Sequence, residues 1–187
     1  MKYAVVTFGC RVNQADSVGI ERQLRALGGR VVSPEDADLV VVNTCSVTAT
    51  ADHGARQTIR RIARTNPGVR IVATGCYATR APLDFTKLPA VTDVVDNSDK
   101  HQLIACLKLE HENPTAQRFG EGDGPCGKTI QPGTAGRTGY TLRVQTGCDE
   151  TCSYCIIPST RGLGRSVPLT RVLAELDDVA AAGFKEV

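Results

Sequence analysis

The chain has 187 residues, a formal net charge of +2 and eight cysteines. This length is enough for one or two domains with a hydrophobic core. The small net charge is not typical of a dedicated nucleic-acid binder, and no stretch reaches the roughly 18 apolar residues of a transmembrane helix. The opening MKYAVVTFGC alternates like a strand and lacks the pattern of a signal peptide. We therefore expect a cytoplasmic protein, with no membrane association, whose cysteines stay reduced rather than forming disulfides.

The first part of the chain alternates between strand and helix patterns. Strands are predicted at residues 2–8, 30–33, 38–43, 70–74 and 92–95, and helices at residues 13–27, 47–64 and 99–109. The apolar stripe of the first helix is expected at Val18, Ile20, Leu24 and Leu27. DLVVVN and RIVAT are continuously apolar, which is typical of strands buried on both faces. The alternation predicts an α/β fold with an open, doubly wound parallel sheet and helices on both faces.

Three cysteines, Cys10, Cys45 and Cys76, each follow one of the long apolar strands. In an open α/β sheet, ligands bind at the carboxyl edge, so we expect these cysteines to converge on one site. Gly9 and Gly75 precede two of them and allow the backbone to turn sharply beside a bulky ligand. The first strand is not followed by G-x-G-x-x-G, which argues against a dinucleotide site.

The later part of the chain has a different character. Glycine and proline interrupt every periodic pattern in residues 110–138, which predicts a linker. A strand is predicted at residues 140–145, a helix at 168–182 and the start of a second strand at 185–187. Three parts are therefore expected, namely a domain at 1–109, the linker at 110–138 and the start of another domain at 139–187.

The predicted helix at 168–182 carries an apolar stripe that includes Val172, Leu176 and Val179. A single strand–helix–strand unit cannot bury such a stripe by itself. We therefore expect the stripe to be exposed and the chain to be the N-terminal part of a longer protein. Cys106 and Cys126 receive no predicted role.

A second group of cysteines, Cys148, Cys152 and Cys155, lies in TGCDETCSYCIIPSTRG, residues 146–162. A structural zinc site usually takes four ligands, and neither cysteine nor histidine follows Cys155. A [4Fe–4S] cluster takes one thiolate per iron, so three cysteines leave one iron open to another molecule. The two cysteine groups therefore predict two [4Fe–4S] clusters, and a non-catalytic iron–sulfur or zinc module remains an alternative.

The spacing C-x3-C-x2-C, with Tyr154 before the last cysteine, resembles the radical S-adenosylmethionine signature. Together with FGCRVNQADS, VVNTCSVT and IVATGCYA, it makes nearly all of the chain outside the linker resemble the methylthiotransferase family. The resemblance implies that residues 139–187 begin a radical-SAM partial barrel with its first β/α unit. It also implies S-adenosylmethionine as a cofactor and Tyr154 as one of the residues that bind it. No catalytic side chain can be named.

The resemblance further implies a role for each cluster. S-adenosylmethionine at the cluster of Cys148, Cys152 and Cys155 would yield a radical that abstracts hydrogen, and the cluster at the other three cysteines would carry the methylated sulfur. Only the first barrel strand is complete, so the chain alone is expected to be inactive. Productive geometry depends on several strands.

Arg11, Val12 and Asn13, together with the sequence IIP after the last cysteine, most resemble one branch of the family. That branch adds a methylthio group to C2 of N6-threonylcarbamoyladenosine at position 37 of tRNA. The alternatives are isopentenyladenosine at position 37 of tRNA and ribosomal protein S12. The implied partners are tRNA and an electron donor such as flavodoxin or ferredoxin, and the oligomeric state is open.

Two further features have alternative interpretations. Asn13 and Asn43 either cap turns or helices or donate hydrogen bonds to cluster sulfur. The basic run of Arg56, Arg60, Arg61 and Arg64 is either a solvated helix face or an RNA-binding face, which would give salt-sensitive tRNA binding.

Overall fold

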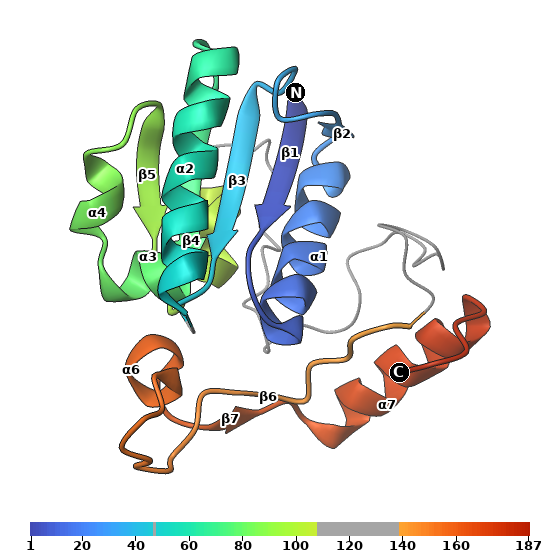
Figure 1. The fold of residues 1–187 in the computed structure, drawn as a ribbon. Coiled ribbons are helices and arrows are strands. Elements are labelled where there is room, and N and C mark those ends of the chain that lie inside the picture. The colour runs from blue at the N-terminus through green and yellow to red at the C-terminus, as the bar shows by residue number, and fades with distance from the viewer. Residues whose placement is uncertain (47, 108–138) are drawn as a thin grey trace.

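The computed structural model describes residues 1–46, 48–107 and 139–187. Its larger part is a five-stranded, wholly parallel sheet with the strand order β2-β1-β3-β4-β5 (Figure 1). The strands are β1 (Lys2–Thr7), β2 (Arg30–Val31), β3 (Leu39–Thr44), β4 (Arg70–Gly75) and β5 (Val91–Val95). This order is that of a doubly wound sheet in which the strand order reverses between β1 and β3. The predicted α/β fold is therefore confirmed.

Helices cover both faces of this sheet. They are α1 (Arg11–Ala26), α2 (Ala49–Thr65), α3 (Cys76–Arg80), α4 (Leu83–Thr86), the 3-10 helix η1 (Lys100–Gln102) and α5 (Leu103–Cys106). All of β3 is buried, and its alternate residues point to opposite faces. Val40 and Val42 pack in one hydrophobic cluster with α2, whereas Leu39 and Val41 pack in another with α1 and α5.

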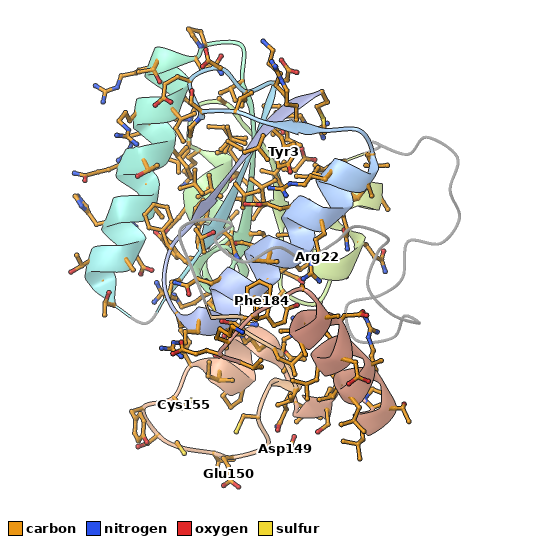
Figure 2. The ribbon with its side chains drawn as sticks, turned by 90° about the vertical axis from the view of Figure 1, so that its right-hand side faces the viewer. Tyr3, Arg22, Asp149, Glu150, Cys155 and Phe184 are labelled. Atoms are coloured by element: carbon orange, nitrogen blue, oxygen red, sulfur yellow. The ribbon has the colours of Figure 1, made fainter. Side chains whose placement is uncertain are left out.

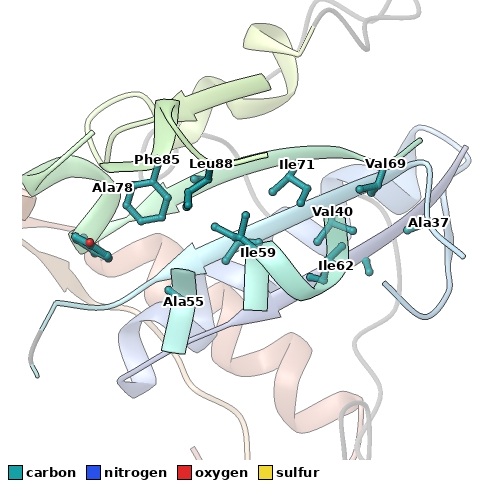
Figure 3. Packing of buried hydrophobic residues seen from close by; sticks show 14 residues of the cluster. Ala37, Val40, Ala55, Ile59, Ile62, Val69, Ile71, Ala78, Phe85 and Leu88 are labelled. Carbon is teal, nitrogen blue, oxygen red and sulfur yellow. The ribbon is translucent and has the colours of Figure 1, made fainter. Parts of the chain in front are cut away.

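The cluster on the α2 side contains the apolar face of that helix (Figure 3). Ile59 and Ile62 of α2 lie over the sheet residues Val40 and Ile71, and all four side chains are fully buried. Burial of such side chains contributes roughly 1.5–3 kcal/mol each to the stability of the fold, relative to exposure.

Of the helices that the structure describes, none combines the length and the apolar character needed to cross a membrane.

The buried face of α1 differs from the predicted stripe. Its buried residues are Asn13, Asp16, Ser17, Ile20 and Leu24, which follow helical spacing along a single face. Val18, which was expected to be buried, is 44% exposed. Three polar residues occupy the face near the start of the helix, and a hydrophobic pattern cannot reveal them. The predicted stripe is therefore confirmed at Ile20 and Leu24, and its inclusion of Val18 is wrong.

Several other element boundaries differ from the prediction. The expected helix at 99–109 is divided into η1 and α5, and residues 108 and 109 lie outside the described part of the chain. The short helices α3 and α4 were not predicted, because they are shorter than the window in which helical periodicity is visible. The predicted linker also lies outside the described residues.

The second described part, residues 139–187, lies beyond the carboxyl ends of the sheet strands (Figure 1). Its elements are β6 (Gln145–Thr146), α6 (Ile157–Arg161), β7 (Arg165–Ser166) and α7 (Leu169–Ala181), with β6 and β7 paired antiparallel. Gly139, which precedes α7 in the chain, and Glu186, which follows it, form a parallel bridge. This connectivity is that of a β/α unit.

The strand predicted at 140–145 is wrong. Only Gln145 of that range belongs to a strand, because the described residues provide strand partners at just two places. Gly139 pairs with Glu186 at the start of the segment, and β7 pairs with β6 at its end. Alternating apolar residues form a strand only where a neighbouring backbone can complete the hydrogen bonds.

The apolar stripe of α7 is more buried than expected. Val179 is 1% exposed, and Val172 and Leu176 are half-buried, so the prediction of an exposed stripe is wrong. The Tyr140 ring packs edge-on against Phe184, which follows α7, with 5.5 Å between centroids. Arg22 of α1 donates to the Tyr140 hydroxyl at 2.9 Å, so the β/α unit is attached to the sheet domain (Figure 2).

The packing of α1 yields a test of the core. Replacement of the fully buried Leu24 by alanine is expected to lower the free energy of unfolding by about 2–5 kcal/mol, because it leaves a cavity between α1 and the sheet. Urea denaturation followed by circular dichroism measures this change. The matched control is Leu83→Ala at a side chain that is 70% exposed, and it should change the free energy by less than about 0.5 kcal/mol. Equal losses in both variants would contradict the assignment of the core.

Candidate metal centre

Cys10, Cys45 and Cys76 lie at the carboxyl edge of the sheet. Residue Thr7 of β1 is paired with Asn43 of β3, and Thr44 of β3 is paired with Gly75 of β4. Each cysteine follows within three residues of these paired positions, and Cys76 is the first residue of α3. Three neighbouring strands, β1, β3 and β4, therefore deliver one thiol each to the same edge.

Two glycines make this arrangement of the backbone possible. Gly9 has φ +104°, and a Cβ atom there would lie 2.2 Å from Cys45 Cβ and 2.4 Å from Cys45 Sγ. The space beside Gly9 is therefore filled by Cys45. Gly75 has φ +98°, and a Cβ atom there would lie 2.2 Å from the Thr44 carbonyl oxygen. Only glycine adopts these conformations without strain and leaves room for the adjacent strand.

The cysteines differ in exposure. Cys45 and Cys76 are buried, at 2% and 5% exposed, whereas Cys10 is exposed. Within the ranges that the structure describes, no three side chains of histidine, cysteine, aspartate or glutamate are grouped closely enough to hold a metal ion. The side chains therefore do not form a preorganised metal site, although their backbones share one edge.

The chemistry at this edge nevertheless fits a bound sulfur-ligated group. Thiols are the soft donors that iron–sulfur clusters require. Three buried polar atoms near the cysteines have no hydrogen-bond partner among the described residues, namely Ser46 Oγ, Thr74 Oγ1 and Asn97 Oδ1. Buried polar atoms are rarely unpartnered, so their position beside Cys45 and Cys76 is consistent with a ligand at this edge.

The second cysteine group occupies the loop between β6 and α6. The Cys148 amide donates to the Gly162 carbonyl at 3.1 Å, and the Gly164 amide donates to Asp149 Oδ1 at 2.9 Å. These bonds close the loop at its base, and Figure 2 shows Asp149, Glu150 and Cys155 on the part that projects away from the sheet. The predicted cofactor-binding residue Tyr154 is 91% exposed on this loop, and Cys152 is also exposed.

A buried polar network lies beneath the first cysteine group. Asp16 of α1 is 1% exposed and accepts from Lys100 Nζ at 3.0 Å, from Arg161 at 3.1 Å and from Arg143 at 2.7 Å. Burial alone would raise the pKa of the Asp16 carboxyl, but the three cations lower this pKa below its ordinary value. Asp16 is therefore ionised at neutral pH.

Asn13 and Asn43 belong to the same network. Asn13 donates to the carbonyls of Phe8, at 2.9 Å, and Thr44, at 2.8 Å. Asn43 donates to the Asn13 carbonyl at 2.8 Å and to Ser17 Oγ at 2.9 Å. Each amide has only two N–H donors, so none remains for cluster sulfur. Neither side chain caps a helix, so the helix-cap interpretation and the interpretation as donors to cluster sulfur are wrong, whereas Asn13 does bind the turn before α1 through the Phe8 carbonyl.

Asn97 is a site residue that the sequence analysis missed. Its Nδ2 lies 3.6 Å from Cys76 Sγ and donates to the Thr160 carbonyl of α6 at 2.8 Å. Arg161, the next residue of α6, was missed as well and donates to Asn13 Oδ1 at 2.6 Å. Asp16 and Asn13 continue the helical spacing of Ile20 and Leu24, but polar residues at such positions are not part of a hydrophobic pattern, so the network was not predicted.

The basic run on α2 lies at a hollow of about 570 Å³ that is lined by Gln57, Arg60, Arg61, Arg64 and Pro89. Arg60, Arg61 and Arg64 are exposed. Arg56, by contrast, lies over the Tyr77 ring, 5.5 Å from its centroid, and donates to its hydroxyl.

The two cysteines without a predicted role lie outside both groups. Cys106 ends α5, and Cys126 lies outside the described residues.

Comparison with known proteins places these features in a family. The model described as "Uncharacterized protein family UPF0004" matches residues 2–96. MtaB of Aquifex aeolicus (strain VF5), a threonylcarbamoyladenosine tRNA methylthiotransferase, is 38% identical over 193 residues, which cover 100% of this chain and 47% of that protein.

Two relatives from Chloroflexus aurantiacus (strain ATCC 29366 / DSM 635 / J-10-fl) have other names. A tRNA-2-methylthio-N(6)-dimethylallyladenosine synthase is 33% identical over 192 residues, covering 100% of this chain and 39% of that protein. The ribosomal protein uS12 methylthiotransferase RimO is 31% identical over 207 residues, covering 100% of this chain and 45% of that protein. The chain thus spans less than half the length of each of these three relatives.

The chain belongs to the UPF0004 family, and along its whole length it is similar to proteins named as methylthiotransferases. The match at residues 2–96 includes the first cysteine group and all five strands of the parallel sheet. The relatives match beyond it through the second cysteine loop.

The geometry of Gly75 yields a second test. Gly75→Ala is expected to lower the free energy of unfolding by at least about 2 kcal/mol, because backbone strain at positive φ costs about 1–3 kcal/mol and the new methyl group meets Thr44. Thermal and urea denaturation measure the loss. Gly68→Ala is the matched control, since no atom lies within 4 Å of its Cβ position, and it should stay within about 0.5 kcal/mol of the wild type. A Gly75→Ala variant as stable as the control would contradict the close approach of β4 to β3.

Proposed function

We propose that the protein is a radical S-adenosylmethionine methylthiotransferase that adds a methylthio group to C2 of N6-threonylcarbamoyladenosine at position 37 of tRNA. The observation that carries this proposal is the 38% identity, over the whole chain, to a relative named for that substrate. The relatives named for dimethylallyladenosine and for ribosomal protein uS12 define the alternative substrates. The proposed place of action is the cytoplasm, with tRNA as substrate and a flavodoxin or ferredoxin as electron donor.

The proposal assigns a [4Fe–4S] cluster to each cysteine group. Cys10, Cys45 and Cys76 would hold the first, and the unpartnered polar atoms beside them support a ligand at this edge. Cys148, Cys152 and Cys155 would hold the second, with S-adenosylmethionine at its open iron. When bound, these groups supply the one-electron chemistry and the sulfur that the protein side chains cannot provide.

The residues of the chain would then bind and orient these groups. Gly9 and Gly75 let three strand ends converge without strain, and the bonds from Cys148 and Gly164 hold the second loop closed at its base. Tyr154, whose side chain is exposed, would cover a ligand on the loop once one is bound. In this proposal, residues 1–109 form the first domain, 110–138 the linker and 139–187 the start of the radical-SAM domain.

The choice of substrate is tested in the organism that encodes the protein. Deletion of the gene is expected to abolish the 2-methylthio group on N6-threonylcarbamoyladenosine, measured by mass spectrometry of tRNA nucleosides. Methylthiolation of isopentenyladenosine and of ribosomal protein S12 should be unchanged and serves as the internal control. Complementation with the wild-type gene should restore the modification, and Cys148→Ala should not. If one of the other two modifications were lost instead, the proposed substrate would be wrong and the protein would be assigned to the branch that makes that modification.

Cluster assembly is tested on the chain itself. Anaerobic reconstitution is expected to yield about eight iron and eight sulfide per chain, since each cluster contains four of each. Cys45→Ala and Cys152→Ala should each remove about half of the iron, because they affect different clusters. Cys106→Ala and Cys126→Ala are the control variants and should retain the full content. Equal loss in the controls would mean that the ligands are wrongly assigned, and a chain that binds zinc without sulfide would favour a non-catalytic module.

A further inference from the structure

The two cysteine groups are distant in the sequence, yet one short helix connects them. Helix α6 begins at Ile157, just after Cys155, and packs against α3, which begins at Cys76. A residue that fixes α6 on the sheet domain therefore also fixes the Cys148–Cys155 loop relative to the first cysteine group.

Two residues of α6, Thr160 and Arg161, make the polar contacts that attach this helix to the sheet domain. The side chain of Arg161, 5% exposed, donates to Asp16 Oδ2 at 3.1 Å and to Asn13 Oδ1 at 2.6 Å. Asn97 donates to the Thr160 carbonyl at 2.8 Å. These contacts come from the last two residues of the helix, on the side that faces the sheet.

The partners of Asp16 show which of the Asp16 contacts can be lost while the sheet domain stays folded. Lys100 binds the same carboxylate oxygen at 3.0 Å and belongs to the sheet domain itself. If α6 detached, Asp16 would keep Lys100 as its counter-ion, and Arg161 would return to water. A buried carboxylate is tolerated when it keeps a charged partner, so the sheet domain does not need Arg161 in order to fold. The Arg161 contact therefore serves the attachment of α6.

We propose that Arg161 and Asp16 are positioning residues that hold the second cysteine loop at a fixed place over the first cysteine group. The inference relies on the proposed function only in treating these cysteines as cluster ligands. The attachment itself involves no bound group and is measurable in the chain without metal.

Amide hydrogen exchange of the 187-residue chain, resolved by peptide mass spectrometry, tests the attachment. Arg161→Gln is expected to increase exchange across residues 146–162 at least about tenfold, since a charge-assisted buried hydrogen bond is lost. Exchange in β3 and β4 should be unchanged. The matched control is Arg165→Gln, an exposed arginine of the same segment, which should leave all rates as in the wild type. Unchanged exchange in Arg161→Gln would overturn the proposal.

Two further variants separate positioning from general packing. Arg161→Lys retains the charge and should restore at least part of the protection, whereas a packing role would treat lysine and glutamine alike. In an Asp16→Asn background, Arg161→Gln should add little, because its partner is already removed. A full additional increase there would overturn the pairing. If Asp16→Asn unfolds the sheet, seen as lost protection in β3, the single variants of Arg161 decide the question.

The consequence for function is measured in the complemented deletion strain. Arg161→Gln should lower the 2-methylthio content of tRNA at least about tenfold, because misplacement by an ångström at a reacting centre has an effect of this order. Arg165→Gln should retain it. Lower methylthiolation with unchanged exchange at residues 146–162 would show that Arg161 acts in another way, and would overturn its role in positioning. Failure of the proposed function would change the modification lost in the deletion strain but not the exchange result.

Discussion

The buried carboxylate of Asp16 is the interaction on which the arrangement of this protein depends. A charged group with 1% exposure is stable only when counter-ions and hydrogen bonds replace its water. Its cations come from three separate parts of the chain, which are η1, the segment before β6, and α6. The carboxylate therefore binds all three parts at once, and it couples the sheet domain to the segment that carries the second cysteine loop.

This charge lies in a polar layer between the hydrophobic core and the thiols. Ile20 and Leu24 pack in the core below, and Asn13, Asp16 and Ser17 continue the same face of α1 toward the carboxyl edge. The layer is well satisfied, because the two asparagine amides give all their N–H groups to backbone or Ser17 acceptors. A satisfied polar network is rigid. The cysteines are thus carried by strand ends whose support cannot easily rearrange.

The same edge explains how a common sheet can serve a specialised reaction. Doubly wound sheets bind ligands at the carboxyl ends of their strands, and here those ends carry thiols rather than a glycine-rich phosphate loop. Helix α6, which directly follows the second cysteine loop, packs at this edge. The fold itself is compatible with many functions, so the proposed chemistry depends on the cysteines of this chain and on its similarity to the relatives.

Local patterns in the sequence determined much of this molecule. Apolar runs predicted the strands of the sheet, and cysteine spacing predicted the two cysteine groups and the place of the first group at the strand ends. These patterns involve only residues that are close together in the sequence. The tertiary structure alone decided which groups meet across the chain. Arg161 reaches Asp16 over 145 positions in the sequence, and Asn97 reaches Thr160 over 63. Residues 140–144 alternate like a strand but lack strand partners among the described residues. A pair of polar side chains or of strands that are distant in the sequence produces no periodic pattern in it. Each partner, considered alone, resembles an ordinary surface residue.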